Sequence, residues 1–181
     1  MDVLDDLKSV IKKIEDIEKK IKETEELCET ITIELNEIKY GLKNYLIDEK
    51  YSLYFDGCSK GNPGLAGAGG VIYQNDKEIS TYSNFLGDNK TNNEAEYSSL
   101  LIGIEEAIKL GIKSLYVYGD SQLVINQILG KYSINNIKLK QFYDNIKKKI
   151  SFFDKIIFTH ILRNKNKRAD ELSNIALKKI E

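Results

Sequence analysis

An apolar stripe near the start of the chain limits how this protein can fold more than any other feature of its sequence. Its members recur at alternating intervals of three and four residues, and the positions between them are largely Lys and Glu. They are Leu7, Val10, Ile14, Ile17, Ile21, Thr24, Cys28, Ile31, Leu35, Ile38, Leu42 and Tyr45. This spacing is a heptad pattern, which predicts one long helix over residues 1–48.

A single helix cannot bury such a stripe against itself. Residues 1–48 contain no turn signal for an internal hairpin, so the partner must come from elsewhere. We expect a coiled coil, with a parallel homodimer as the first choice. A helix from another protein and packing against the rest of this chain remain alternatives. Thr24 and Cys28 weaken the middle of the seam.

The sequence changes character after residue 48. Residues 1–48 carry a net charge of −5, whereas the remaining residues carry +4. Short runs rich in β-branched and aromatic residues follow, separated by glycine and asparagine. The full length of 181 residues suits one full-sized core plus an extension. We therefore predict two parts, a coiled-coil helix over 1–48 and one catalytic-sized domain over 49–181.

The second part predicts nine regular elements. Strands are expected at 50–58, 71–74, 79–86, 114–119 and 155–162, and helices at 91–110, 121–129, 136–151 and from 166 onward. Glycines punctuate the chain between Gly57 and Gly70, and Asn75 with Asp76 forms a turn between the second and third strands. The order βββαβααβα predicts an α/β fold in which helices cover a mixed five-stranded sheet.

The sequence argues against a membrane-spanning or exported protein and against a zinc or disulfide scaffold. No stretch approaches the roughly 20 apolar residues that span a bilayer, and the chain opens with Asp2, Asp5 and Asp6 instead of a basic and then apolar targeting segment. Cys28 and Cys58 match neither zinc-binding spacing nor a disulfide framework. We therefore expect a cytoplasmic protein without a zinc or disulfide scaffold.

Four acidic residues stand where the predicted elements begin or end. Asp56 lies in the first strand and Asp120 ends the fourth. Glu96 lies in the first turns of a helix, and Asp170 lies in the last helix. From this topology we expect Asp56, Glu96 and Asp120 to converge at one edge of the sheet, and Asp170 to join them when the last helix packs over the same edge. Carboxylates without accompanying Cys or His suit Mg²⁺ or Mn²⁺ better than zinc, and two such ions roughly 3.5–4 Å apart can assist an in-line phosphoryl displacement.

These residues belong to four motifs that occur in a fixed order. The motifs are Tyr54–Gly64, Thr91–Tyr97, Tyr118–Val124 and Asn166–Leu172. Here the sequence resembles the type 1 ribonuclease H family over about residues 50–180. The resemblance implies the ribonuclease H-like five-stranded mixed sheet and hydrolysis of the RNA strand of RNA/DNA hybrids, leaving 3′-hydroxyl and 5′-phosphate ends. It also implies two Mg²⁺ ions, Asp56 bridging both, Asp170 helping to hold one, and Glu96 with Asp120 holding the other.

Four polar residues match the family's substrate-binding positions. Asn62, Asn93 and Gln122 match positions that contact the wide, shallow minor groove of the hybrid. Thr91 matches a position that grips a phosphate of the DNA strand, and a helix N-terminus favours that role. An ordinary turn at Asn62 and an ordinary helix cap at Thr91 are the alternative interpretation, and both roles can hold together.

The sequence departs from the fullest family pattern in two places. Many members carry a histidine in a loop before the last aspartate, whereas here only residues 163–166 separate the fifth strand from the final helix. His160 is expected inside the strand with a structural role, which leaves turnover to Arg163 or solvent. Many relatives also insert a basic helical handle, but residues 130–136 form only a short linker, so each domain should grip hybrid weakly.

Three other functions compete with a ribonuclease H. A catalytically silent scaffold would use the coiled coil as its working part, but it has no need of all four acids. A resolvase-like or integrase-like nuclease would act on DNA, although the asparagines and Thr91 favour hybrid. A fragment of a reverse transcriptase is less attractive, because residues 1–48 resemble no polymerase connection segment.

Overall fold

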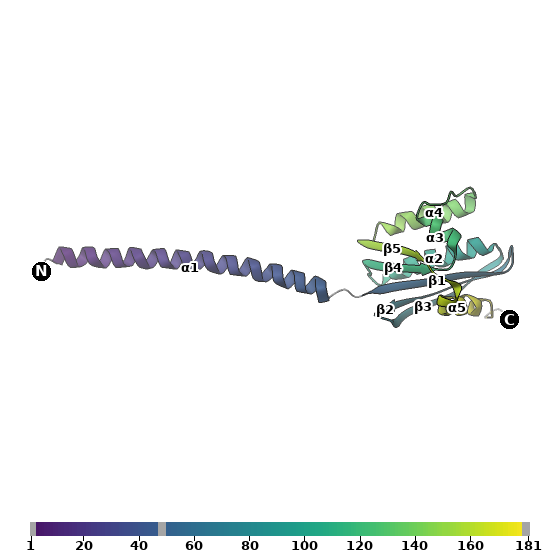
Figure 1. Ribbon diagram of the computed structural model, residues 1–181, viewed down its shortest axis with the longest axis horizontal. Coiled ribbons are helices and arrows are strands. Elements are labelled where there is room, and N and C mark those ends of the chain that lie inside the picture. The colour runs from purple at the N-terminus through teal and green to yellow at the C-terminus, as the bar shows by residue number, and fades with distance from the viewer. Residues whose placement is uncertain (1–2, 47–49, 179–181) are drawn as a thin grey trace. The chain divides into compact units, whose positions relative to one another are not determined.

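The computed structural model describes residues 3–46 and 50–178, and the side chains of residues 11–38 and 50–178. The chain divides into two compact units, an N-terminal unit of residues 1–48 and a C-terminal unit of residues 49–181. The N-terminal unit is one helix, α1 (Val3–Leu46), as the heptad pattern predicted (Figure 1). Pairing of this helix into a coiled coil stays a prediction.

The apolar stripe of α1 is solvent-exposed. Its isoleucines and leucines between residues 14 and 38 are 46–59% exposed. The burial that would stabilise the helix is therefore absent from the N-terminal unit itself. Among the described residues, no helix combines the length and the apolar character that crossing a membrane requires.

The C-terminal unit is built on a five-stranded mixed sheet, as predicted. The strands are β1 (Tyr51–Gly61), β2 (Gly64–Gln74), β3 (Lys77–Lys90), β4 (Ser114–Gly119) and β5 (Lys155–His160). Their order across the sheet is β3-β2-β1-β4-β5. The first three strands form an antiparallel meander, and β4 and β5 run parallel to β1. This order puts β1, which carries Asp56, at the centre of the sheet.

Helices cover both faces of this sheet (Figure 1). They are α2 (Asn92–Lys109), α3 (Gln122–Ile128), α4 (Ile137–Ile150) and α5 (Lys167–Lys178). The main core lies between the sheet and helices α2, α3 and α4, where Leu53, Leu100 and Ile104 are fully buried. Helix α5 packs over β1, β2 and β3 on the opposite face. We call the face that α5 shares the outer face.

Strand β2 is longer than predicted, because a run of glycines that looked like loop punctuation is paired strand. A Cβ on Gly69 would stand 2.0 Å from the backbone N of Ser173, and one on Gly67 would stand 2.4 Å from the Ser173 carbonyl oxygen. Glycine at these positions lets α5 lie directly on β2. The sequence pattern predicts that these glycines interrupt regular structure, but their small size instead allows a helix to pack closely on the strand.

The helix boundaries agree with prediction because side-chain caps mark them. The Thr91 hydroxyl accepts from the Glu94 N–H, Ser121 accepts from Val124, and Asn136 accepts from the first turn of α4. The strand boundaries shift more. β1 and β3 run further than expected, and β5 stops at His160 before a single 3₁₀ turn, Arg163–Lys165.

Candidate active site

Asp56 and Asp120 are brought together by the parallel pairing of β1 and β4. Phe55 and Gly119 are partners in this ladder, so the residue after each lies at the same sheet edge. Gly57 admits α2 to that edge, because a Cβ there would stand 2.2 Å from the Glu96 backbone N. The Gly57 N–H donates to Glu96 Oε2 at 3.2 Å. The pairing of β1 with β4 and the packing of α2 on β1 thus bring three carboxylates together.

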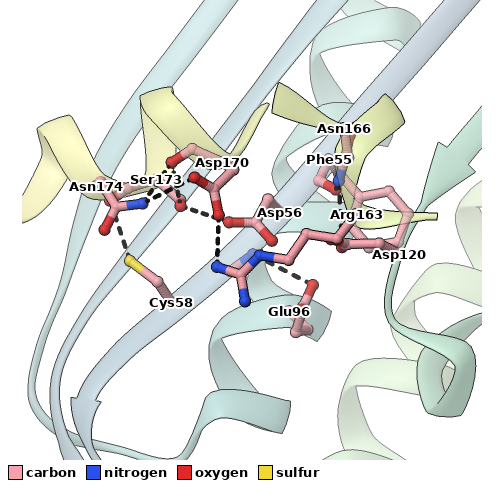
Figure 2. A network of polar contacts seen from close by, with 11 residues as sticks. Phe55, Asp56, Cys58, Glu96, Asp120, Arg163, Asn166, Asp170, Ser173 and Asn174 are labelled. Carbon is pink, nitrogen blue, oxygen red and sulfur yellow. Dashed lines mark hydrogen bonds and ion pairs between the residues drawn. The ribbon is translucent and has the colours of Figure 1, made fainter. Parts of the chain in front are cut away.

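The oxygens of Asp56, Glu96 and Asp120 lie within 4.8 Å of one another. Asp56 is only 5% exposed and Glu96 only 6%, whereas Asp120 is half-buried. Figure 2 shows these side chains converging below the start of α5. No Cys or His takes part in this group of described residues. The donors are therefore hard, anionic oxygens, which suit Mg²⁺ or Mn²⁺.

Burial and the charges of neighbouring acids destabilise the charged forms of Asp56 and Glu96. Burial raises the pKa of Asp56 to about 6, and the nearby charges of Asp120 and Asp170 act in the same direction. The pKa of Glu96 lies well above its ordinary value, because of burial and the charges of Asp56 and Asp120. A cation among them would relieve this repulsion, so the residues fit a divalent metal ion.

Asp170 lies beside this group of three and is held by a different partner. Its Oδ1 accepts from Arg163 at 2.7 Å, and Figure 2 shows the arginine side chain reaching across the cluster to it. Arg163 is 80% exposed, so solvent screens this ion pair. The four acids predicted from sequence thus share one site, with three oxygens tightly grouped and the fourth paired to a guanidinium.

Two residues that orient the acids were missed by the sequence reasoning. The Ser173 hydroxyl donates to Asp56 Oδ2 at 2.5 Å. Asn166 is 1% exposed, and its Nδ2 donates to the Phe55 carbonyl at 2.9 Å and to Asp120 Oδ1 at 3.2 Å. Ser173 follows Asp170 by three residues and therefore shares its helix face, which was the available signal. Asn166 opens the last motif and ties it to β1 and β4.

His160 lies at the end of β5, within the strand as expected, but it is exposed. Its Nε2 lies 3.3 Å from the Asp120 carbonyl oxygen. Leu162, expected at the end of this strand, lies beyond it and is 63% exposed. The imidazole is therefore at the rim of the site, not in the core.

An open cleft of about 300 Å³ lies over the carboxylates. Its walls include Asn92, Ser121 and Arg163 in addition to the three grouped acids. The Asn62 side-chain oxygen accepts from the Asn92 N–H at 3.1 Å, which joins the β1–β2 turn to the start of α2. Two predicted substrate residues, Asn62 and Thr91, therefore border the helix start that forms one wall.

The start of α2 is fixed by a reciprocal capping box. The Thr91 N–H donates to Glu94 Oε2 at 2.8 Å, and the Thr91 hydroxyl accepts from the Glu94 N–H. Burial raises the pKa of Glu94, but the bonds from Thr91 and the charge of Lys138 outweigh it and leave the pKa lowered. Asn93 follows the cap and Gln122 follows Ser121, and both side chains are exposed. The predicted cap role of Thr91 is confirmed.

The family model described as reverse transcriptase-like matches residues 54–176. A solved structure of LC11-RNase H1 in complex with RNA/DNA hybrid aligns with a TM-score of 0.69 and 35% identity, covering 72% of this chain and 99% of that one. The chain belongs to the ribonuclease H family.

Two curated relatives show how far this membership extends. The ribonuclease HI of Halobacterium salinarum is 38% identical over 124 residues, and the match covers 68% of this chain and 62% of the relative. The bifunctional protein Rv2228c of Mycobacterium tuberculosis is 36% identical over 128 residues, with 67% of this chain and 34% of the relative covered. The chain thus spans less than two thirds of these relatives, and the ribonuclease H likeness rests on the C-terminal unit.

Proposed function

We propose that this protein is an endonuclease that hydrolyses the RNA strand of RNA/DNA hybrids and leaves 3′-hydroxyl and 5′-phosphate ends. The observation that carries the proposal is the group of three carboxylates, within 4.8 Å of one another, under an open cleft. Ribonuclease H family membership and a structural neighbour solved with hybrid support the choice of substrate.

Asp56, Glu96 and Asp120 would hold divalent cations, with Asp170 contributing from α5. We propose two Mg²⁺ ions, with Mn²⁺ as the alternative. Bound in such a site, divalent cations lower the pKa of a water and offset charge on the attacking and leaving oxygens. Burial and the neighbouring carboxylates raise the pKa of Asp56 and Glu96, so a bound cation would stabilise their charged forms.

The surrounding residues keep the acids in position. Ser173 holds one oxygen of Asp56, the Gly57 N–H holds Glu96, and Asn166 holds Asp120. These bonds come from three different elements. Each leaves another carboxylate oxygen available to face the cleft, and this arrangement fixes the acids before substrate arrives.

Hybrid would be recognised by groups beside the cleft. Asn62, Asn93 and Gln122 carry amides suited to 2′-hydroxyls and base edges in a wide minor groove. Thr91 and the N-terminus of α2 offer a hydroxyl and outward N–H groups to a phosphate of the DNA strand. Asn92 and Ser121 line the cleft and are the chain neighbours of Thr91, Asn93 and Gln122, and Asn62 bonds to Asn92, which supports this assignment.

Cleavage of labelled RNA/DNA hybrid by wild type and Asp56→Asn, with and without Mg²⁺, tests the proposal. We expect metal-dependent cleavage by wild type and a loss of at least roughly a thousand-fold in the variant, with hybrid binding kept. Asp144→Asn, which changes an exposed aspartate on α4, is the matched control and should cleave normally. Absence of cleavage by wild type would favour a silent scaffold, and preferred cleavage of duplex DNA would favour a DNA nuclease.

We also propose that α1 forms a parallel homodimer. The exposed stripe requires a partner, and the flanking charges suit a second copy in register. We call the stripe residues spaced seven apart from Leu7 the first seam column: Leu7, Ile14, Ile21, Cys28, Leu35 and Leu42. In a parallel pair, the residue just before each member of this column meets the residue five positions later on the other copy. This opposes Lys13 to Glu18, Lys20 to Glu25 and Glu34 to Lys39. Three attractive pairs and no repulsive one favour this orientation.

Sedimentation equilibrium tests the dimer with a matched pair of substitutions. Ile31→Lys puts a charge in the seam, whereas Ile33→Lys makes the same change off the seam at a position that is 60% exposed. We expect a monomer for Ile31→Lys and a dimer for wild type and Ile33→Lys. A monomeric wild type would contradict the proposal.

Cys28 reports the orientation of the two helices. It is exposed and lies in the first seam column, so a parallel in-register pair sets it against its own copy. Mild oxidation should give a covalent dimer, and Cys28→Ser should abolish it while Cys58→Ser should not. An antiparallel pair would place the two Cys28 residues apart and leave the chains uncrosslinked.

A further inference from the structure

A row of tyrosines crosses the outer face of the sheet. Tyr54 of β1 stacks on Tyr118 of β4, with ring centroids 4.9 Å apart and planes inclined by 25°. Tyr73 of β2 meets Tyr54 edge-on, with centroids 5.6 Å apart. Tyr116 precedes Tyr118 by two residues and therefore shares its face. We call Tyr73, Tyr54, Tyr118 and Tyr116 the tyrosine row.

The tyrosine row lies on the same face of the sheet as the carboxylates Asp56 and Asp120. Tyr54 precedes Asp56 by two residues, and Tyr118 precedes Asp120 by two residues, so the same alternation places all four on the outer face. A nucleic-acid strand that leaves the cleft over β1 and β4 would pass Arg163, which lines the cleft, and Asn166, which lines the neighbouring pocket with Tyr54, before it reaches these rings. No role in the metal site or in groove recognition accounts for them.

Positive charge accompanies the rings. The Lys155 and Lys50 ammonium groups lie 5.5 Å and 5.8 Å from the centroid of the Tyr116 ring. Lys155 also donates to the Tyr116 hydroxyl at 3.4 Å. Beyond them on β5, Ile157 is 40% exposed and Thr159 is exposed. This end of the outer face therefore presents aromatic, apolar and cationic groups to solvent.

The other end of the row forms one wall of a pocket of about 250 Å³. Tyr54 and Tyr73 line it together with Asp76, Lys165 and Arg168. Arg168 is paired with Glu78 at 3.0 Å, so Lys165 is the cation better placed to meet a phosphate. The volume falls below the roughly 300–1,000 Å³ of pockets for drug-sized ligands, which suits one nucleobase.

We propose that the tyrosine row and its pocket bind single-stranded nucleic acid, and in particular the unpaired extension of a hybrid held in the cleft. Base stacking on aromatic rings beside lysines is how proteins hold single strands without sequence preference. A duplex keeps its bases stacked on one another and presents mainly its backbone, so rings of this kind serve unpaired bases. The proposal rests on the proposed function for the identity of the hybrid, but binding can be measured without cleavage.

Fluorescence anisotropy with labelled oligodeoxythymidine and oligouridine of about ten nucleotides tests the binding. The full chain is used in EDTA so that cleavage does not interfere. We expect Tyr116→Leu to weaken binding about ten-fold and Tyr116→Phe to retain it, because phenylalanine keeps the stacking surface. Lys155→Gln should flatten the salt dependence by about 0.7 in the log–log slope. The two oligonucleotides show whether DNA or RNA is preferred.

Tyr132→Leu is the matched control, because Tyr132 is 48% exposed in the linker between α3 and α4. If Tyr116→Leu binds as tightly as Tyr132→Leu, the proposal is wrong. Thermal melting of each variant distinguishes a loss of binding from a loss of folding. If Tyr116→Leu is destabilised, binding by Lys155→Gln is compared with binding by Lys131→Gln instead.

Cleavage of two hybrids separates this proposal from the proposed function. Wild type should cut a hybrid with a single-stranded extension faster than a blunt hybrid, and Tyr116→Leu should cut the blunt hybrid normally but lose the preference. Wild type that cuts neither hybrid would overturn the proposed function, while the anisotropy titration would still decide the tyrosine row. Equal preference in wild type and Tyr116→Leu would overturn the role of the row in capturing extensions.

Discussion

Helices α1 and α2 are both amphipathic, but the apolar face of α2 is buried and that of α1 is exposed. In α2, Tyr97, Leu100 and Ile104 are fully buried in the core of the C-terminal unit. In α1, Ile17 and Leu35 are 56% and 59% exposed. The difference teaches that periodicity alone sets the helix, whereas the surface that covers it comes from the rest of the fold or from another molecule.

The buried helix restricts the size of the residues that it packs against, whereas the exposed helix does not. α2 approaches β1 so closely that Gly57 has no room for a side chain, and that approach brings Glu96 to Asp56. α1 meets no comparable constraint within its own unit. Substitutions in the C-terminal unit should therefore change folding and chemistry together, while those in α1 should change association.

Among substitutions that leave the acids intact, the largest effect on cleavage is expected where α2 meets β1. In Gly57→Ala the new Cβ would overlap the backbone of residues 95 and 96, so strand and helix must separate. We expect a loss of about 1–3 kcal/mol in the free energy of unfolding and a roughly hundred-fold fall in hybrid cleavage, because Glu96 is displaced. Denaturant unfolding and single-turnover cleavage measure the two. Gly87→Ala, where a Cβ meets nothing but φ is positive, controls for backbone strain alone.

One substitution made in both helices tests the contrast directly. Ile104→Ala should lower the free energy of unfolding of the C-terminal unit by about 2–5 kcal/mol, because it opens a cavity in the core. Ile17→Ala should leave that transition unchanged and instead weaken self-association. Chemical denaturation at two protein concentrations distinguishes them. A drop in the same transition for both variants would mean that α1 packs on the C-terminal unit.

Deletion of residues 1–46 tests whether α1 contributes to activity only through self-association. The C-terminal unit forms its own compact core, so we expect it to fold and to cut short hybrids at the wild-type rate. Degradation of long hybrids should fall several-fold, because two linked sites raise effective concentration on one substrate. A time course on short and long hybrids checks this. Equal losses on both substrates would contradict the role given to α1.

The smallest effect is expected at an exposed charge of the active site. Arg163 pairs with Asp170 but is 80% exposed, so the pair contributes roughly 0.2–1 kcal/mol. Arg163→Gln should therefore tighten Mg²⁺ binding by up to about five-fold, because a competing cation is removed. Thermal stabilisation by Mg²⁺ measures this without relying on turnover. Lys165→Gln, in the same 3₁₀ turn, is the control, and weaker Mg²⁺ binding by Arg163→Gln would contradict the prediction.

The sequence by itself determined the elements whose signals are local. The heptad spacing predicted α1, and the hydroxyl and amide caps at Thr91, Ser121 and Asn136 set where helices begin. Strand alternation and motif order placed Asp56, Glu96 and Asp120 at one sheet edge, and the structure groups their oxygens within 4.8 Å. The helix positions and caps depend on residues a few positions apart, which is why periodicity and capping could find them, whereas the grouping of the carboxylates also needs β1 to pair with β4 and α2 to pack on β1.

The tertiary structure alone decided the features that depend on residues far apart in the chain. Glycines of β2 were read as breakers because their partner, the backbone of α5, lies about a hundred residues away. The Ser173 bond to Asp56 and the grip of Asn166 on Asp120 likewise join distant segments. A local pattern carries no record of what will pack against it, so the close approach of a helix and the orientation of a carboxylate emerge only when the chain is folded.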